Sequence, residues 1–362
     1  MITTRDEVPQ RCSACITTAT AGKLDADGLC QECKGYQRQE KLLGEEALAQ
    51  ELASLPRPGR YDCVVPLSGG KDSMYILYYL VRKLGLRPVA VNFDGGYQVP
   101  IARQNCIEAC RILKTPLYLM KVQRSVRRAI LRAALRMSVA DGNAWLTCGD
   151  CESMLRLSAI RIARKHHVPF VMWGSSPLES TNAAVVRYGK SRMKSIAKRL
   201  VRAVTSREKL PRLLNITPHL LRMALLQMCQ KHLMGAPWSS VVRPFKITPF
   251  TTEAPRFVFF YDYVSWDSIA HVDVLKRELN WRHPPDHDIR FDCQLHAFGN
   301  FERLRYYGIT GDGLALCRYI REGKISREDA LRRERRLLET VIPECREIME
   351  DLGVPAGRTG VW

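Results

Sequence analysis

Short apolar runs alternate with longer amphipathic stretches through the first half of the chain. The apolar runs predict strands at residues 62–67, 88–93, 117–122 and 168–173, and the amphipathic stretches predict helices at 73–84, 100–113 and 152–166. Strands that alternate with helices form parallel sheets, because the chain must cross back over the sheet between strands. The pattern therefore predicts an α/β fold with a doubly wound parallel sheet, whose binding crevice lies at the carboxyl ends of the strands.

Composition changes on both sides of this alternation divide the chain into five predicted parts. They are a four-cysteine zinc-binding module at 1–37, a linker helix at 38–60, the α/β domain at 61–177, a basic helical insert at 178–245 and a mostly helical C-terminal region at 246–362. Within the last part, the aromatic residues of segment 257–266 are expected to pack in a core or at a domain interface.

The six residues Ser68-Gly69-Gly70-Lys71-Asp72-Ser73 stand between a predicted strand and a predicted helix. The two glycines let backbone N–H groups approach an anion, and the amino end of the helix adds a partial positive charge. The Ser68 and Ser73 hydroxyls and the Lys71 ammonium group can bind phosphate oxygens, whereas Asp72 would face a phosphate only with a magnesium ion between them. The spacing excludes the GxxxxGK[ST] loop of other nucleotide-hydrolysing enzymes.

This SGGKDS segment resembles the SGGxDS loop of the N-type ATP pyrophosphatases, the PP-loop superfamily. The resemblance implies an adenine nucleotide alpha hydrolase-like fold. It also implies an enzyme that cleaves ATP between the α and β phosphates, attaches AMP to a carbonyl oxygen of its substrate and lets a nucleophile displace the AMP. ATP contacts are implied for residues 68–73, for Asp94 after the second strand, and for Gly174 and Ser175 after the fourth, with Lys71 and Asp72 as catalytic residues.

Further segments are similar to one branch of this superfamily, the N-acetyl sugar amidotransferases. They are the CxxC…GxCxxC piece at 12–33, the basic middle part, and residues 279–281, Cys293 and 323–331 of the tail. This likeness implies an amidotransferase whose acceptor is an anionic substrate such as a nucleotide-sugar. Its ammonia is expected from a separate glutaminase, because the sequence contains no segment that looks like a glutamine-hydrolysing domain.

Two CxxC pairs, Cys12 with Cys15 and Cys30 with Cys33, are separated by 14 residues, the spacing of a four-cysteine zinc site. Because this module has too few apolar residues to fold alone, bound zinc would supply most of its folding free energy, typically ~10–16 kcal/mol. We expect the site to be structural, or to dock a partner or nucleic acid.

A third CxxC, formed by Cys148 and Cys151, stands ahead of the predicted helix that includes Arg156 and Arg164. A helix amino end and nearby cations lower the pKa of a thiol, so both cysteines are expected to be partly thiolate at neutral pH and catalytic. A persulfide or disulfide-exchange pair, a second zinc site and an inert helix cap are the alternatives.

The same pair is similar to the CxxC of tRNA thiolation enzymes in this superfamily. That likeness implies an iron–sulfur site, a [4Fe–4S] cluster held by Cys148, Cys151 and one distant cysteine, for which Cys293 is the first choice and Cys229 and Cys317 are rivals. Three thiolates and one open position are typical of a catalytic cluster rather than a closed structural one.

Most of the net charge of +19 lies in one stretch of the chain. Residues 121–231 contain 22 Lys and Arg against five Asp and Glu, and residues 187–231 contain twelve against Glu208 alone. Such a segment is too basic for an ordinary solvated helix face. It predicts a track for nucleic-acid phosphates, a lid over ATP and a nucleotide-sugar, or a docking face for an acidic partner, so the charge alone does not select tRNA.

No apolar run reaches the roughly 18 residues that span a bilayer, and the start of the chain lacks the apolar core of a signal peptide. We therefore expect a cytoplasmic protein without membrane contact. In that compartment the 13 cysteines serve metal binding or thiol chemistry rather than disulfides.

The residues and the resemblance together predict an ATP-dependent transferase with ATP, Mg²⁺ and Zn²⁺ as cofactors and a homodimer as a candidate assembly. Nitrogen is the expected nucleophile. The alternative is a sulfurtransferase that thiolates tRNA or a small molecule through Cys148 and Cys151, with sulfur from a separate donor protein. A zinc-bearing nucleic-acid-binding protein without turnover is the third hypothesis, and the presence of both Lys71 and Asp72 argues against it.

Overall fold

The structure, a computed structural model, describes nine segments of the chain. They are residues 9–36, 42–55, 59–141, 148–174, 218–219, 221–222, 224–230, 255–283 and 291–353. The predicted basic insert lies outside the described residues except for the three short helical pieces between 218 and 230.

Five parallel strands form one sheet in the order β3-β2-β1-β4-β5. Four of them coincide with the predicted strands, and the bounds are β1 (Cys63–Leu67), β2 (Pro88–Asp94), β3 (Leu117–Lys121), β4 (Phe170–Trp173) and β5 (Arg256–Phe259). The predicted α/β class and the parallel sheet are therefore confirmed.

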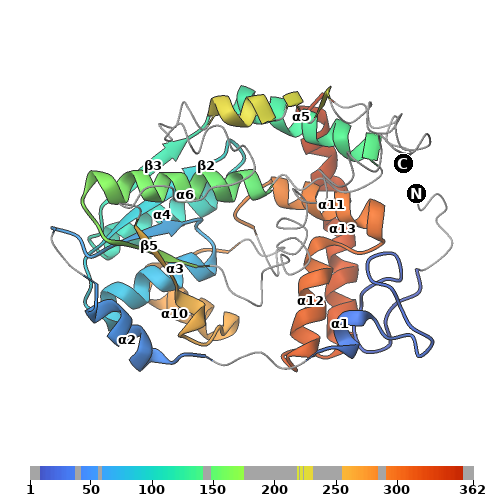
Figure 1. Cartoon of the computed structure of the whole chain (residues 1–362), viewed down its shortest axis with the longest axis horizontal. Coiled ribbons are helices and arrows are strands. Elements are labelled where there is room, and N and C mark those ends of the chain that lie inside the picture. Colours follow the sequence, from blue (N-terminus) through green and yellow to red (C-terminus); the bar gives the residue numbers. More distant parts are fainter. Residues whose placement is uncertain are drawn as a thin grey trace, which may run out of the picture.

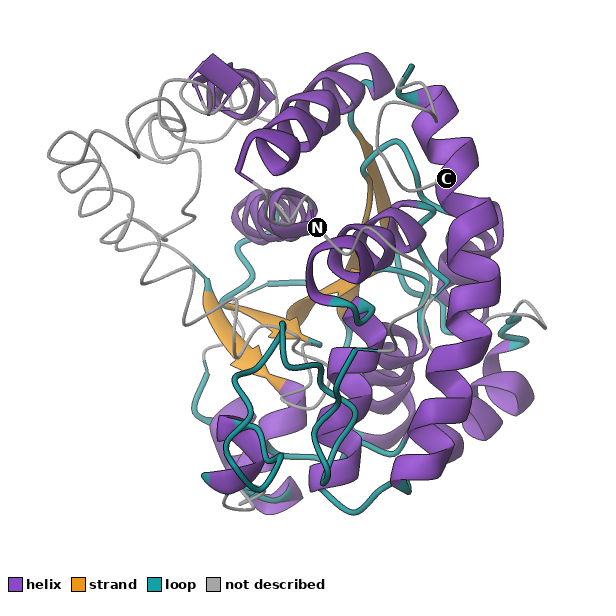
Figure 2. Ribbon diagram, turned by 90° about the vertical axis from the view of Figure 1, so that its right-hand side faces the viewer, coloured by secondary structure: helices purple, strands orange, loops and turns teal. Residues whose placement is uncertain are grey.

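Helices cover both faces of this sheet (Figures 1 and 2). One face of β1 packs with α3 (Lys71–Tyr78), which continues as the π-helical turn η1 (Tyr79–Lys83), and α4 (Pro100–Ile112) lies on the same side. The other face packs against α6 (Cys148–Lys165) through a layer of valines and alanines. Successive strand residues point to opposite faces, so β1, which is buried throughout, supplies side chains to both layers.

The strand order places the change of winding direction between β1 and β4. From β1 the chain moves outward to β2 and β3, and it then returns across the sheet to β4 on the other side of β1. Ligands of open α/β sheets bind outside the carboxyl ends of the strands at such a point. The residues that follow β1 and β4, beginning at Ser68 and Gly174, are the ones placed there.

The fifth strand comes from the aromatic segment that we expected only to pack in a core or interface. Residues 256–259 pair in parallel with β4, and the chain continues into the 3₁₀ turn η2 (Phe260–Asp262) and α10 (Ser268–Leu279). The sheet thus takes a strand from beyond the basic insert. The run Phe257-Val258-Phe259 has the apolar character of a strand, but nothing local to it specifies its partner.

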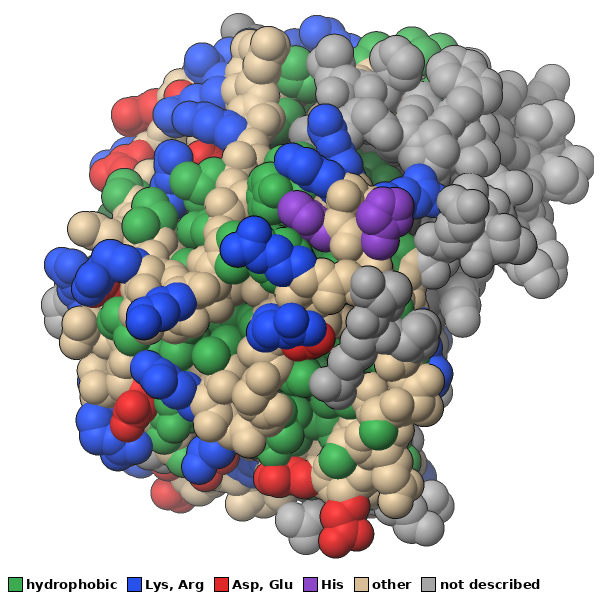
Figure 3. All heavy atoms as spheres, turned by 90° about the vertical axis from the view of Figure 1, so that its left-hand side faces the viewer, with side chains coloured by type: hydrophobic (Ala, Val, Ile, Leu, Met, Phe, Trp, Pro, Cys, Tyr) green, Lys and Arg blue, Asp and Glu red, His purple; other side chains and the backbone are tan. Residues whose placement is uncertain are grey.

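The remaining helices gather beside the sheet and carry the N-terminal module (Figure 1). They are α5 (Arg124–Asp141), α11 (Leu295–Tyr307), α12 (Gly311–Arg321) and α13 (Arg327–Asp351). Within residues 9–36 the module has one short helix, α1 (Gln31–Lys34), and it contacts α12 and α13; the linker contributes α2 (Glu45–Ala53). Figure 3 shows Lys and Arg side chains spread across one face of the described surface.

One buried acid in this helical region predicts a pH-dependent stability. Glu302 of α11 is 3% exposed, and burial raises the pKa of its carboxyl to about 7. Folding therefore takes up a proton between pH 4.5 and 7, and stability falls as the pH rises through that window. Glu302→Gln, which carries no charge, should raise the free energy of unfolding by up to about 3 kcal/mol at pH 8 and by little at pH 4.

Urea unfolding of the wild type and of Glu302→Gln at both pH values measures this difference. Glu328→Gln, on the exposed first turn of α13, is the matched control and should change stability little at either pH. An equal gain for Glu302→Gln at pH 4 and pH 8 would show that the buried charge is not the cause.

Candidate active site and metal centre

The loop between β1 and α3 is built so that only glycine fits at its centre. Gly69 has φ +88°, and a Cβ placed on it would lie 2.1 Å from the backbone oxygen of Ala102. The backbone is therefore packed directly against the start of α4. This close approach leaves the amino end of α3 at the carboxyl edge of the sheet, where helix N–H groups favour an anion.

The two serines of the loop hold its shape. Ser68 Oγ accepts a hydrogen bond from the Gly70 N–H at 3.2 Å, and Ser73 Oγ accepts one from the Ser68 N–H at 3.1 Å. The two hydroxyl oxygens lie 3.3 Å apart. Both hydroxyls predicted to bind phosphate are thus brought together at the amino end of α3.

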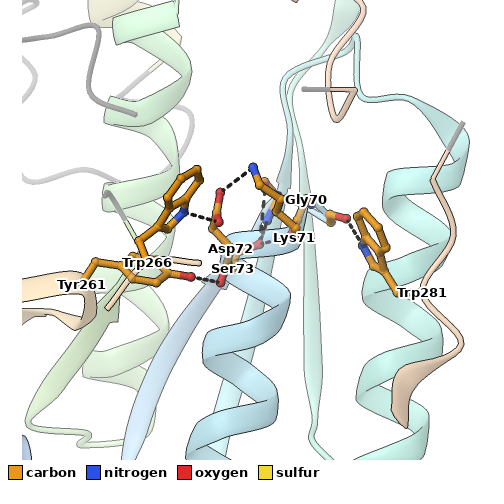
Figure 4. Close-up of polar contacts among 9 residues, drawn as sticks. Gly70, Lys71, Asp72, Ser73, Tyr261, Trp266 and Trp281 are labelled. Atoms are coloured by element: carbon orange, nitrogen blue, oxygen red, sulfur yellow. Dashed lines mark hydrogen bonds and ion pairs between the residues drawn. The ribbon is translucent and has the colours of Figure 1, made fainter. Parts of the chain in front are cut away.

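Lys71 and Asp72 form an ion pair above this helix end (Figure 4). Lys71 Nζ lies 3.3 Å from Asp72 Oδ2, and each side chain is 15% exposed. The other carboxylate oxygen, Oδ1, accepts a hydrogen bond of 2.7 Å from Trp266 Nε1. Asp72 is therefore oriented by a tryptophan from a segment nearly two hundred residues away.

Two further aromatic side chains hold the loop from different sides (Figure 4). Tyr261 donates its hydroxyl to the Asp72 carbonyl oxygen at 3.1 Å, and Trp281 donates its indole N–H to the Gly69 carbonyl oxygen at 3.0 Å. Sequence reasoning missed these three aromatic residues as parts of the site. Their side-chain O–H and N–H groups could have indicated such a role, because a buried Tyr or Trp usually needs a polar partner.

The loops after β2 and β4 lie on either side of the loop between β1 and α3. Asp94 accepts hydrogen bonds from the backbone of Gly96 at 2.7 Å and of Gln98 at 3.4 Å, so it shapes its own loop. Gln98 Nε2 in turn donates to the Ser68 carbonyl oxygen at 3.0 Å. After β4, a Cβ on Gly174 would lie 3.9 Å from Ser73 Cα, whereas Ser175 lies outside the described residues.

A buried arginine contacts one cysteine of the third CxxC. Arg127 of α5 is 1% exposed, and its Nη2 donates to Cys151 Sγ at 2.9 Å. A guanidinium that donates to a sulfur stabilises a thiolate more than a thiol. The same sulfur faces Gly95, just after β2, where an added Cβ would lie 3.0 Å from it.

One of the two cations that we expected beside this pair, Arg156, has other contacts. Arg156 forms an ion pair of 2.9 Å with Glu152 and lies over the ring of Trp173, and the helix itself begins at Cys148 rather than at Glu152. The expectation of a nearby cation is therefore met by a different element, α5. The side chain of Cys148 lies outside the described residues.

Cys293, the first choice as third cluster ligand, pairs with the loop after β2 that Cys151 also contacts. It pairs with Gln98 in an antiparallel bridge, so Cys293 and Cys151 border the same loop after β2. Its rival Cys317 instead lies beside Cys15 in the N-terminal module, and Cys229 is exposed on the helical piece 224–230. This placement favours Cys293 over both rivals.

The four N-terminal cysteines converge on one point. Their sulfur atoms all lie within 4.8 Å of one another, and Cys12, Cys15 and Cys30 are buried. Backbone N–H groups point at three of the ligating sulfurs, with Cys30 N 3.3 Å from Cys12 Sγ, Thr17 N 3.5 Å from Cys15 Sγ and Cys33 N 3.4 Å from Cys30 Sγ. The donor set and its spacing fit a metal ion.

Thiols of this cluster shift one another's pKa values. Hydrogen bonding from Cys15 lowers the pKa of Cys30, whereas hydrogen bonds to Cys30 raise the pKa of Cys15, and those to Cys15 raise the pKa of Cys33. Sulfurs this close resist carrying several negative charges together. A bound metal cation removes that resistance, because it is ligated by thiolates.

In the part of the chain that the structure describes, no helix is long and apolar enough to cross a membrane. No family model matches the sequence. The chain is 28% identical over 118 residues to an uncharacterized protein of Methanocaldococcus jannaschii, a match that covers 30% of this chain and 42% of that protein. The chain thus spans less than half of the length of this relative.

Two solved structures are similar to the chain at low identity. NMN synthetase from Francisella tularensis aligns with a TM-score of 0.27 and 19% identity, over 37% of this chain and 56% of that one. The U34-tRNA thiolase NcsA from Methanococcus maripaludis, solved with its [4Fe-4S] cluster, aligns with a TM-score of 0.37 and 13% identity, over 92% of this chain and 89% of that one.

Proposed function

We propose that the chain is an ATP-dependent adenylating transferase that releases pyrophosphate. The observation that supports it is the loop at the end of β1: Gly69 packed against the backbone of Ala102, two serine hydroxyls, and the Lys71–Asp72 pair at the amino end of α3. The resemblance of SGGKDS to the PP-loop and its place at the change of winding direction both support an ATP phosphate chain as the ligand.

The proposed reaction has two steps. The carbonyl oxygen of the acceptor attacks the α-phosphorus of ATP, an O–P bond forms, the bond to the bridging oxygen of the β-phosphate breaks, and pyrophosphate leaves. A nucleophile then adds to the activated carbon and AMP departs with the former carbonyl oxygen. Both steps develop negative charge on phosphate oxygens, which fixed cations and N–H donors stabilise.

The loop residues supply that stabilisation. Lys71 and the backbone N–H groups of Gly69 and Lys71 bind the phosphate oxygens, and the Ser68 and Ser73 hydroxyls donate to them. A magnesium ion held by Asp72 would neutralise charge on the phosphate chain. Trp266 keeps the Asp72 carboxylate pointing at that position through its 2.7 Å hydrogen bond.

For the nucleophile, we propose nitrogen first, because the tail and the cysteine module are similar to those of N-acetyl sugar amidotransferases. The acceptor is then an anionic substrate such as a nucleotide-sugar, and the ammonia comes from a separate glutaminase, in the cytoplasm. Zinc is the metal that we propose for Cys12, Cys15, Cys30 and Cys33, since four thiolates are its usual structural ligand set.

A sulfurtransferase is the second candidate, and the Arg127–Cys151 contact favours it. A thiolate beside the loop after β2 could carry a persulfide or, with Cys148 and Cys293, hold a [4Fe-4S] cluster. The acceptor would then be tRNA or a small molecule, and the sulfur would come from a donor protein.

One variant separates the two candidates. Cys151→Ser should lower sulfide-dependent transfer at least about 100-fold if this cysteine ligates a cluster whose open iron binds the sulfide, yet leave ammonium-dependent amidation within a few-fold of wild type. Pyrophosphate release is measured with ATP, ammonium or sulfide, and either a panel of UDP-N-acetyl sugars or total tRNA. Cys229→Ser is the control, because Cys229 is exposed and remote in sequence from both cysteine sites.

Two outcomes would contradict what we propose. Loss of both activities in Cys151→Ser would contradict the nitrogen proposal, because that proposal gives Cys151 no role in ammonium-dependent amidation. Release of orthophosphate in place of pyrophosphate by the wild type would contradict adenylation altogether.

A further inference from the structure

The turn between α12 and α13 reaches the aromatic residue that orients Asp72. Lys324 in this turn donates from Nζ to the carbonyl oxygen of Trp266 at 3.2 Å, and its Nζ lies 5.8 Å from the centre of the indole ring. Lys71 Nζ lies 5.3 Å from the same ring centre. Two ammonium groups from opposite ends of the chain therefore gather at one indole beside the loop.

This arrangement has local support from α12. Tyr319 stacks on Trp266 with ring centres 5.3 Å apart, and its carbonyl oxygen accepts the Lys324 backbone N–H at 2.9 Å. The Lys324 side chain is exposed, so it can reach a ligand in solution. Two ammonium groups within 6 Å of the same ring centre raise the local positive potential, which favours a polyanion over a singly charged ligand.

We propose that Lys324 is a second cationic ligand of the ATP phosphate chain, held in place by the four-cysteine metal module. The proposal rests on the proposed function, because it takes the phosphate chain as the anion at the loop. It adds a binding residue from the C-terminal region and a role for the metal site within this chain.

The four-cysteine module contacts both ends of the turn that carries Lys324. On one side, Arg321 at the end of α12 lies with Nη1 3.8 Å from Cys33 Sγ and 4.0 Å from Cys15 Sγ, and its Nη2 pairs with Glu32 at 3.2 Å. The Arg321 side chain is 11% exposed. A metal with four thiolates carries net negative charge, and this arginine is placed to neutralise part of it.

On the other side, Arg327 at the start of α13 donates to the carbonyl oxygens of two metal-site cysteines. Its Nε lies 3.0 Å from the Cys15 oxygen and its Nη2 3.2 Å from the Cys12 oxygen. Only Glu322 to Ser326 separate the two arginines. When the cysteines are ordered around a metal, both arginines are fixed, and the turn with Lys324 is fixed between them.

The first test measures nucleotide affinity. Lys324→Met should weaken binding of α,β-methylene-ATP with Mg²⁺ at least about tenfold by calorimetry and leave AMP binding unchanged, because AMP lacks the β and γ phosphates. Lys276→Met, an exposed lysine of α10, is the matched control and should match wild type. Equal affinities of Lys324→Met and Lys276→Met for the analogue would overturn the proposal and leave the proposed function standing.

The second test measures the link to the metal. Arg321→Met should release metal to a competing chelator about 10- to 100-fold more readily and weaken analogue binding in the same direction as Lys324→Met. Arg332→Met, on the exposed side of α13, is the control. A variant that loses metal but binds the analogue like wild type would overturn the role of the module, and a wild type that binds no analogue would overturn both this proposal and the proposed function.

Discussion

Asp72→Asn is expected to lower the rate of pyrophosphate release about 100- to 1,000-fold, which corresponds to roughly 3–4 kcal/mol of transition-state stabilisation. Asparagine keeps the size of the side chain and an oxygen that can accept the Trp266 indole N–H. It removes the negative charge that would hold magnesium against the phosphate chain. A lower rate of pyrophosphate release therefore reflects the loss of the Asp72 charge and not a change in the shape of the loop.

The rate is measured as pyrophosphate released from ATP in the presence of the acceptor and ammonium or sulfide. Asp273→Asn, on the exposed side of α10, serves as the control for a lost surface charge. Metal content and circular dichroism should match wild type in both variants, because Asp72 lies outside the four-cysteine module. An Asp72→Asn enzyme that keeps a third or more of the wild-type rate would contradict the assigned role.

Cys12→Ser is expected to abolish metal binding at the N-terminal module and to release the module from the C-terminal helices. A structural four-cysteine metal contributes on the order of 10–16 kcal/mol to the folding of such a module, far more than its few apolar contacts can replace. Loss of one of four converging thiolates removes most of that stabilisation. Arg321 and Arg327 then lose the ordered sulfurs and carbonyl oxygens that they contact.

Three measurements test this prediction in Cys12→Ser and in the wild type: the metal bound per chain, limited proteolysis of residues 9–36, and thermal unfolding. The expected result is one metal ion lost, rapid cleavage in the module and a lower Tm. Cys229→Ser is the matched control, since Cys229 is an exposed cysteine outside the cluster. Full metal content and protease resistance in Cys12→Ser would show that these four cysteines do not form the metal site.

The strand–helix alternation illustrates what can be predicted from sequence. β1 to β4 and the helices α3, α4 and α6 were predictable because each is marked by its own periodicity. Helix α5, between β3 and β4, was not predicted. The SGGKDS loop was equally visible, because its glycines, charges and flanking elements are neighbours in the chain. The cysteine module follows from spacing alone, since two CxxC turns can close around one ion.

The partners of these local motifs were not predictable. β5, Trp266 and Trp281 follow the basic insert, and Arg127 belongs to a helix that gave no sign of facing a thiol. Each of these contacts depends on how elements far apart in sequence pack together, and periodicity carries no information on that choice.

By itself, the sequence therefore determined the fold class, the anion-binding loop and the four-cysteine cluster, because each is encoded by residues close together in the chain. Only the tertiary structure decided which side chains support them: the tryptophan that orients Asp72, the arginine beside Cys151, and the turn that carries Lys324 from the metal module to the loop. These are long-range contacts, and their free energy comes from packing and charge pairing that exist only once the chain has folded.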